Sequence, residues 1–267
     1  MDNEAARDPE VYSDAAVIYL DLLKRALTRF GFSEDLPQLR YARQPDPDAI
    51  ADPWLLRKRG QDWPRFAETM VGLGRLDHLE NSFQDVRARE VEGDLVEAGV
   101  WRGGASIFMR GLLAAHGDLT RRVWLADSFQ GLPVPNEELY PVDTGLTFHK
   151  IPYLKVGLET VQQNFRKYNL LDERVQFLVG WFSDTLPTAP IEKIAILRVD
   201  ADMYQSTTEV LINLESKVSP GGIVVIDDYG CVDACRAAVT DYRRLCDIDA
   251  PLIPVDDSCV YWVKPLD

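Results

Sequence analysis

The chain of 267 residues is long enough for one large α/β domain with an additional segment, or for two small domains. Its 46% hydrophobic and 27% charged residues are ordinary for a globular protein. The formal net charge of −14 argues against a general role in binding nucleic acid or an anionic membrane, because such partners require a basic surface.

The N-terminus has no apolar signal core, and no apolar run approaches the roughly 20 residues of a membrane span. Cys231 and Cys235 lie four residues apart, but the three histidines are too distant in sequence to complete a zinc site with them. We therefore expect free thiols and a soluble, cytoplasmic protein.

The first third of the chain predicts a helical cap. Residues 11–30 have apolar positions at helical spacing, ending near Gly31, and residues 54–89 return to this pattern. Residues 31–53 are rich in proline and charge, which predicts a long, lid-like loop. The expected inner face of the second helical stretch consists of Phe66, Met70, Leu73, Leu76 and Leu79.

From residue 94 onward, short apolar strands alternate with helical segments. Five βα units are expected, followed by a hairpin formed by residues 252–255 and 260–263. This order predicts an α/β fold with a sheet of about seven strands, mostly parallel, and one antiparallel strand near an edge. The expected strands of the βα units are 95–98, 123–126, 175–179, 194–199 and 223–226.

The fourth and fifth predicted strands both end in acidic residues. Asp200 and Asp202 follow the fourth strand, and Asp227 and Asp228 follow the fifth. Parallel strands joined by a helix place their carboxyl ends at one edge of the sheet, so these carboxylates are expected to converge. A divalent cation with oxygen ligands would relieve their repulsion. The alternative is that they are solvated loop residues or helix caps.

The turn after the first strand discriminates between cofactors. Gly99, Gly103 and Gly104 lack the Gly-x-Gly-x-x-Gly spacing of nicotinamide-binding turns, although they could simply permit close strand–helix packing. Glu97, two residues before the first glycine, suits a cationic group better than a pyrophosphate. Asp127, at the end of the second strand, can accept hydrogen bonds from a ribose diol. Together these residues suit S-adenosylmethionine.

The sequence resembles the macrocin O-methyltransferase family, whose metal-dependent members methylate deoxysugar hydroxyls of macrolide and aminocoumarin antibiotics. The resemblance implies a Rossmann-like, seven-stranded class I methyltransferase sheet in residues 91–267. It also implies that residues 1–90 form a helical cap that helps to close the acceptor site. The matching segments are Gly99–Gly104, Trp124–Gly131, Gly180–Asp184, Arg198–Tyr204 and Ser219–Tyr229.

By this resemblance, Asp200, Asp227 and Asp228 match metal-binding carboxylates, with Mg²⁺ as the expected ion. Glu97 and Asp127 match residues that hold the cofactor's amino and ribose groups. The complete set of residues predicted to contact the cofactor is Met70, Glu97, Gly99, Trp101, Ser106, Asp127, Ser128, Trp181 and Asp184.

The chemistry requires removal of a proton from a weakly acidic hydroxyl while the sulfonium methyl is attacked in line. Asp202 matches a proposed general base, and its alternative role is that of a solvated or outer carboxylate. His149 is a second candidate for catalysis, or simply a loop histidine. A cation chelated by two neighbouring sugar hydroxyls would favour the alkoxide.

Two other enzyme classes remain open. A metal-dependent catechol or phenol O-methyltransferase would use the same sheet and carboxylates. The Asp-x-Asp motif at Asp200 and Asp202 also occurs in nucleotide-sugar glycosyltransferases, although that interpretation leaves Glu97 and Asp127 without a role. The expected partner is a small glycosylated secondary metabolite, and the family resemblance suggests a homodimer or higher homo-oligomer.

Overall fold

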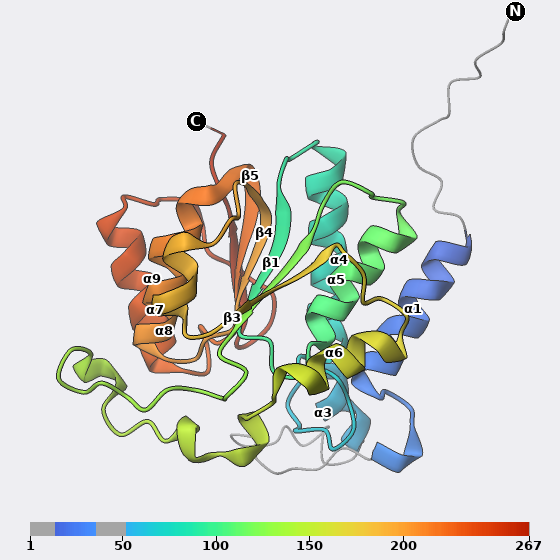
Figure 1. Cartoon of the computed structure of the whole chain (residues 1–267), viewed down its shortest axis with the longest axis horizontal. Helices are drawn as coiled ribbons and strands as arrows, with labels where there is room; N and C mark the ends of the chain where they lie inside the picture. Colours follow the sequence, from blue (N-terminus) through green and yellow to red (C-terminus); the bar gives the residue numbers. More distant parts are fainter. Residues whose placement is uncertain (1–13, 36–51, 267) are drawn as a thin grey trace, which may run out of the picture.

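The computed structural model describes residues 14–35 and 52–266. At its centre lies a seven-stranded sheet with the order β3-β2-β1-β4-β5-β7-β6 (Figure 1). Neighbouring strands from β1 to β5 pair in parallel, whereas β7 runs antiparallel to both β5 and β6. The strands are β1 Asp94–Ala98, β2 Val123–Asp127, β3 Val175–Val179, β4 Ile194–Val199, β5 Val218–Ile226, β6 Ile253–Pro254 and β7 Val260–Val263.

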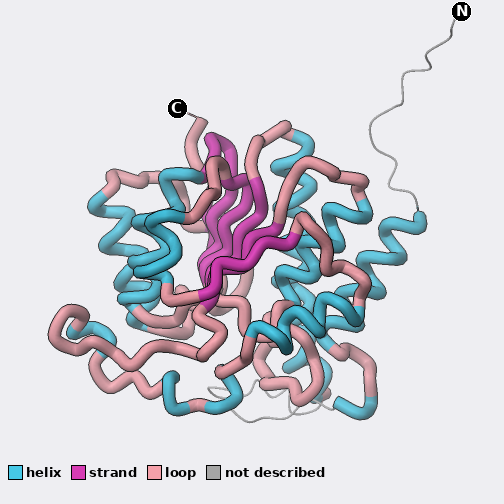
Figure 2. Tube along the Cα trace, in the orientation of Figure 1, coloured by secondary structure: helices cyan, strands magenta, loops and turns pink. Residues whose placement is uncertain are grey.

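Helices cover both faces of the sheet, so the molecule has three layers (Figure 2). One face carries α7, α8 and α9, and the other carries α1, α4, α5 and α6 (Figure 1). The helices that follow the strands are α5 Gly104–Ala115, α6 Leu158–Lys167, α7 Phe182–Thr185, α8 Tyr204–Leu214 and α9 Asp233–Leu245.

The alternation of side chains along each strand produces two apolar cores. In β1, Leu95 packs into the core under α1, α4 and α5, whereas the next residue, Val96, packs into the core under α8 and α9. Every residue of β4 is buried, which is expected for a central parallel strand covered on both faces. The predicted α/β sheet, with its antiparallel strand next to the edge, is confirmed.

The helical cap consists of α1 Asp14–Thr28, α3 Pro53–Arg59 and α4 Gly72–Ala88. The prediction of one helical stretch over residues 54–89 is wrong, because an irregular segment separates α3 from α4. Gly60 and Gly72 both have positive φ angles, and their backbones pack so closely that a Cβ on Gly72 would lie 2.3 Å from the nitrogen of Gly60. Phe66 is consequently 46% exposed instead of facing the core.

After β3 the chain forms α7 and a short 3-10 helix, Leu186–Thr188. One further local prediction differs from the structure. β5 begins at Val218, five residues before the predicted start. Most of the predicted lid, residues 31–53, lies outside the described part of the chain.

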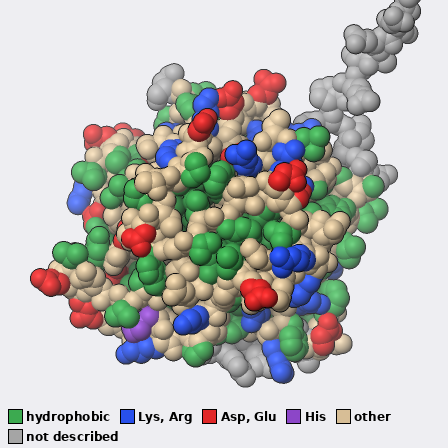
Figure 3. Space-filling model, in the orientation of Figure 1, with side chains coloured by type: hydrophobic (Ala, Val, Ile, Leu, Met, Phe, Trp, Pro, Cys, Tyr) green, Lys and Arg blue, Asp and Glu red, His purple; other side chains and the backbone are tan. Residues whose placement is uncertain are grey.

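Within the described residues, no helix is long and apolar enough to span a membrane. On the face drawn in Figure 3, acidic and basic side chains are interspersed, and hydrophobic side chains gather near the centre. This face therefore lacks, among its described residues, the continuous basic area that binding to nucleic acid would require.

Candidate active site

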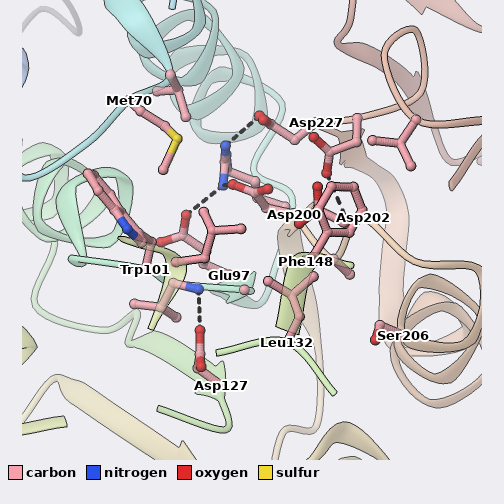
Figure 4. A pocket seen from close by; sticks show the side chains of 18 of the residues that line it. Met70, Glu97, Trp101, Asp127, Leu132, Phe148, Asp200, Asp202, Ser206 and Asp227 are labelled. Atoms are coloured by element: carbon pink, nitrogen blue, oxygen red, sulfur yellow. Dashed lines mark hydrogen bonds and ion pairs between the residues drawn. The ribbon is translucent and has the colours of Figure 1, made fainter. Parts of the chain in front are cut away.

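A cavity of about 840 Å³ lies at the carboxyl ends of the parallel strands. The turns after β1 to β5 all contribute to its wall, as expected for the ligand crevice of an open α/β sheet. Segment 60–75 of the cap closes a further part of it. In Figure 4, Met70, Trp101 and Glu97 lie on one side of the cavity, and Asp200 and Asp202 lie on the other.

The turn after β1 has a backbone shape that its sequence requires. Gly99 has a φ of +88°, and a Cβ at this position would lie only 1.7 Å from the carbonyl oxygen of Asp200. The turn is held by Asp127, whose carboxylate accepts hydrogen bonds from the backbone nitrogens of Val100 at 2.7 Å and Phe129 at 2.6 Å. Asp127 therefore fixes the wall of the cavity and also lines it.

Glu97 is buried at the end of β1 and faces the same cavity. One oxygen accepts a hydrogen bond from Arg198 at 2.6 Å, and the other accepts one from the hydroxyl of Ser106. Burial raises the pKa of Glu97 to about 7, although Arg198 and Ser106 oppose this shift. A cationic group entering here would favour the charged carboxylate.

The N-terminus of α5, where a Rossmann turn would hold a phosphate, is covered by the cap. The backbone nitrogen of Gly104 donates to the carbonyl oxygen of Glu68 at 2.9 Å. A Cβ at Gly104 would lie 2.5 Å from the side chain of Thr69, so the cap packs directly against this helix end. The backbone nitrogen of Gly104 is therefore already paired and is not available to a pyrophosphate.

Three carboxylates converge on the opposite side of the cavity. Asp200, Asp202 and Asp228 each offer an oxygen, and these oxygens all lie within 4.8 Å of one another. Burial raises the pKa of Asp202 to about 8, and repulsion from Asp200 and Asp227 adds to the shift. The pKa of Asp228 is also raised, by burial and by the neighbouring carboxylates. Such a set of oxygen donors with excess negative charge fits a divalent cation such as Mg²⁺.

Asp227, the neighbouring acid at the end of β5, is engaged differently. Its two oxygens pair with Arg198 and with Arg75. Arg75 comes from α4 in the cap and also binds Asp256, in the turn between β6 and β7, at 2.7 Å. In this structure Asp227 therefore joins the cap to the sheet, and Asp202 completes the group of three carboxylates.

The remaining predicted site residues divide into two groups. Besides the residues already placed, Met70, Trp101, Ser128 and Trp181 line the cavity. The residues that do not line it are Ser106, which lies behind Glu97, His149 in the short helix Phe148–Lys150, and the exposed Asp184.

The sequence interpretation missed several residues that the structure places at the site. Arg198 could have been found, because it lies two residues before Asp200 and therefore on the same side of the strand. Arg75 could not, because nothing local connects α4 with an aspartate 152 positions away. Asp257 and Ser258, in the β6–β7 turn, also reach the cavity wall.

Comparison with known proteins places this geometry in a family. The family model described as Macrocin-O-methyltransferase (TylF) matches residues 16–264. A sugar-directed 4'-O-methyltransferase of Streptomyces olivaceus, named for 8-demethyl-8-(2,3-dimethoxy-alpha-L-rhamnosyl)-tetracenomycin-C, is 50% identical over 250 residues, which are 93% of each chain. The demethyldecarbamoylnovobiocin O-methyltransferase of Streptomyces niveus is 45% identical over 96% of each chain.

A solved structure agrees with these relatives. The O-methyltransferase NovP superposes with a TM-score of 0.85 at 45% identity, covering 94% of this chain and 99% of its own. The calicheamicin methyltransferase CalS11 shares the fold, with a TM-score of 0.58 at 19% identity over 97% and 98% of the two chains. The predicted fold class and the predicted O-methyltransferase activity are thereby confirmed, and the chain belongs to the macrocin O-methyltransferase family.

Proposed function

We propose that the protein uses S-adenosylmethionine and Mg²⁺ to methylate a hydroxyl of a deoxysugar carried by a secondary metabolite. The observation that carries this proposal is the division of one cavity into two halves. Glu97 and Asp127 form a half suited to a cationic, ribose-bearing cofactor, and Asp200, Asp202 and Asp228 form a half suited to a cation. Two relatives are named for methyl transfer to a rhamnosyl-tetracenomycin and to demethyldecarbamoylnovobiocin, which supports a glycosylated antibiotic as the acceptor.

In the cofactor half, we assign Glu97 to the amino group and Asp127 to the ribose hydroxyls. Met70 and Trp101 supply apolar contact, and Trp181 borders the same cavity from the loop after β3. The covered N-terminus of α5 favours a cofactor without a pyrophosphate, which disfavours nicotinamide dinucleotides.

In the acceptor half, the bound cation would lower the pKa of a coordinated sugar hydroxyl and fix its direction. We assign Asp200 and Asp228 to holding the cation, with Asp227 as the further predicted ligand. Asp202 is the proposed proton acceptor, because its carboxylate borders the cavity and lies next to Asp200 and Asp228, the residues assigned to the cation. His149 becomes a weaker candidate, since it does not line the cavity.

A catechol or phenol methyltransferase would need the same carboxylates, so the acceptor separates it from the sugar enzyme. A glycosyltransferase explains Asp200 and Asp202 but gives Glu97 and Asp127 no function. The homodimer, the cytoplasmic location and the division into a cap of residues 1–90 and a domain of residues 91–267 stay predictions.

Calorimetric titration of S-adenosylhomocysteine into the purified protein tests the cofactor assignment. We expect micromolar binding that Asp127→Ala weakens by at least about tenfold, since both the turn and the ribose contacts are lost. Asp233→Ala is the matched control, because Asp233 is an exposed acid at the start of α9 that does not line the cavity. Absence of binding to the folded wild-type protein would refute the methyltransferase assignment of this cavity.

Transfer of a labelled methyl group tests the acceptor class. The wild-type protein should label a deoxysugar glycoside with free neighbouring hydroxyls and leave the corresponding aglycone unlabelled. Labelling of a catechol in place of the glycoside would favour the phenol enzyme.

A further inference from the structure

Beyond its buried start at Phe129, the long connection between β2 and α6, residues 128–157, is fixed to the rest of the molecule by side-chain hydrogen bonds at two points. Half of its residues are exposed, including Val134 at 71% and Leu139 at 68%. Asp143, in the middle of this exposed stretch, is completely buried. A buried carboxylate in an exposed connection requires strong partners, since its desolvation is costly.

The partners of Asp143 belong to α8. Its two carboxylate oxygens accept hydrogen bonds from the backbone nitrogens of Tyr204 at 2.7 Å and Gln205 at 3.0 Å. The residue at the cap position of α8, Met203, contributes no side-chain cap. Asp143 therefore caps this helix from 61 positions away in the sequence, and its negative charge also suits the helix N-terminus.

The position of α8 makes this contact relevant to catalysis. α8 begins two residues after Asp202, whose φ of +55° is rare for a residue other than glycine. The backbone nitrogen of Asp202 donates to Asp228 at 3.3 Å. The direction of the Asp202 carboxylate thus depends on a short, sharply bent segment whose C-terminal end is held by Asp143.

The second fixed point is Tyr153. Its hydroxyl donates to the carbonyl oxygen of Pro64 in the cap at 2.7 Å, and its ring stacks on Trp63 with centroids 4.8 Å apart. Its own carbonyl oxygen accepts a hydrogen bond from the indole nitrogen of Trp101 at 2.9 Å. Tyr153 therefore ties the connection to the cap and to the turn after β1.

Residues 144–152 join these two points, and within them Phe148 and Ile151 line the cavity. We propose that Asp143 and Tyr153 are positioning residues that hold this segment over the two halves of the site, Asp143 setting the acceptor and catalytic half and Tyr153 setting the cofactor half. The proposal rests on the proposed methyl transfer for its functional consequences, whereas its structural consequences can be measured without any turnover.

The two contacts act on separate groups, so their effects should separate. Loss of the Asp143 contact frees the N-terminus of α8 and the segment that carries Asp202, with little change at Glu97 and Asp127. Loss of the Tyr153 contact loosens Trp101 and the cap, with little change at α8. Small displacements of a reacting group can reduce turnover by orders of magnitude.

The test compares Asp143→Ala and Tyr153→Ala in the full chain. Asp143→Asn and Tyr153→Phe are the conservative variants, since the first keeps one acceptor oxygen and the second keeps the ring stack. Glu138→Ala is the matched control, because it removes an exposed carboxylate from the same connection. The readouts are the dissociation constant of S-adenosylhomocysteine, the kcat and KM with a glycoside acceptor, and hydrogen exchange of the backbone.

We expect Asp143→Ala to reduce kcat/KM for the acceptor by about tenfold or more while the dissociation constant of S-adenosylhomocysteine changes less than about twofold. Tyr153→Ala should instead raise the dissociation constant of S-adenosylhomocysteine by about tenfold. Faster exchange should appear at residues 203–206 in the first variant and at residues 60–66 and 99–104 in the second. The conservative variants should restore part of each effect.

The proposal would be overturned if both variants changed cofactor binding and acceptor turnover to the same extent. It would also be overturned if Asp143→Ala matched the wild-type protein in both acceptor turnover and hydrogen exchange. If Asp143→Ala does not fold, Asp143→Asn carries the same comparison. Failure of the proposed function is distinguishable, since the wild-type protein would then transfer no methyl group while the exchange patterns could still separate the two positions.

Discussion

The side chains of Glu97 and Arg198 meet across β1 and β4, where the two residues are paired in register, and the guanidinium donates to the carboxylate at 2.6 Å. Arg198 also pairs with Asp200 at 2.9 Å and with Asp227. The buried guanidinium of Arg198 therefore contacts Glu97, the acid proposed to bind the cofactor. It also contacts Asp200, proposed to bind the metal ion, and Asp227, which binds the cap.

Arg198→Met should destabilise the protein strongly, because it leaves buried carboxylates without their cation. Breaking a buried ion pair in this way costs about 3 to 5 kcal/mol of the free energy of unfolding. Urea denaturation measures this change, and Arg198→Lys is the matched control, since it retains the charge and should lose less. Unchanged stability of the Arg198→Met variant would show that the carboxylates do not depend on this guanidinium.

Asp228→Asn should weaken binding of a divalent cation by about tenfold or more, because one charged oxygen ligand is replaced by a neutral amide. Titration with Mn²⁺, followed by electron paramagnetic resonance of the free ion, measures the affinity directly. Asp233→Asn is a suitable control, since Asp233 is an exposed acid at the start of α9. Equal affinities of the two variants would exclude Asp228 as a ligand.

Acid should destabilise the protein through His78, in α4. Burial lowers the pKa of His78 to about 4, although Asp256 opposes the shift, and its ring packs against Tyr261. In the unfolded chain the imidazole of His78 is protonated with a pKa near 6.5. The contribution of neutral His78 to the free energy of unfolding is therefore fully present above pH 6.5 and is lost as the pH falls towards 4. At pH 5 the loss amounts to about 2 kcal/mol.

Urea denaturation at pH 7.5 and pH 5.0 tests this expectation, with His78→Gln as the variant that cannot gain the charge. The wild-type protein should lose more of its free energy of unfolding than the variant over this interval. Parallel pH dependence of the two proteins would contradict the proposed cause.

Gly99→Ala should prevent folding or lower the free energy of unfolding by at least about 2 kcal/mol, because it combines a positive φ with a direct backbone clash. The added Cβ would lie 1.7 Å from the carbonyl oxygen of Asp200. Gly74→Ala, in α4, is the control, since a Cβ there meets nothing within 4 Å. That substitution should stabilise the protein by about 0.5 to 1 kcal/mol, as measured by thermal unfolding.

The sheet and the convergence of acids could be predicted because both depend on local pattern. β4 is an apolar run interrupted only by Arg198 and followed by Asp200, and the strand–helix–strand rule places its end beside that of β5. The sequence also predicts the turn at Gly99 from its glycines. These features need only short-range sequence and the handedness of parallel connections.

Features that depend on distant contacts could not be predicted in this way. The apolar spacing around Phe66 suits a helix, but the close packing of Gly60 on Gly72 breaks the helix instead. The pairing of Asp227 with Arg75 depends on how the cap docks on the sheet. The burial of Asp143 depends on a helix N-terminus 61 positions further along the chain.

The covered end of α5 has a consequence for engineering within this family. The carbonyl oxygen of Glu68 and the side chain of Thr69 contact Gly104, and Met70 borders the cavity beside Glu97 and Trp101. Exchange of the first ninety residues between two relatives would therefore transplant part of the cofactor's surroundings together with any acceptor preference. A graft intended to change the sugar alone should end before Gly60, so that the recipient retains its own residues 60–75 and with them its cofactor wall.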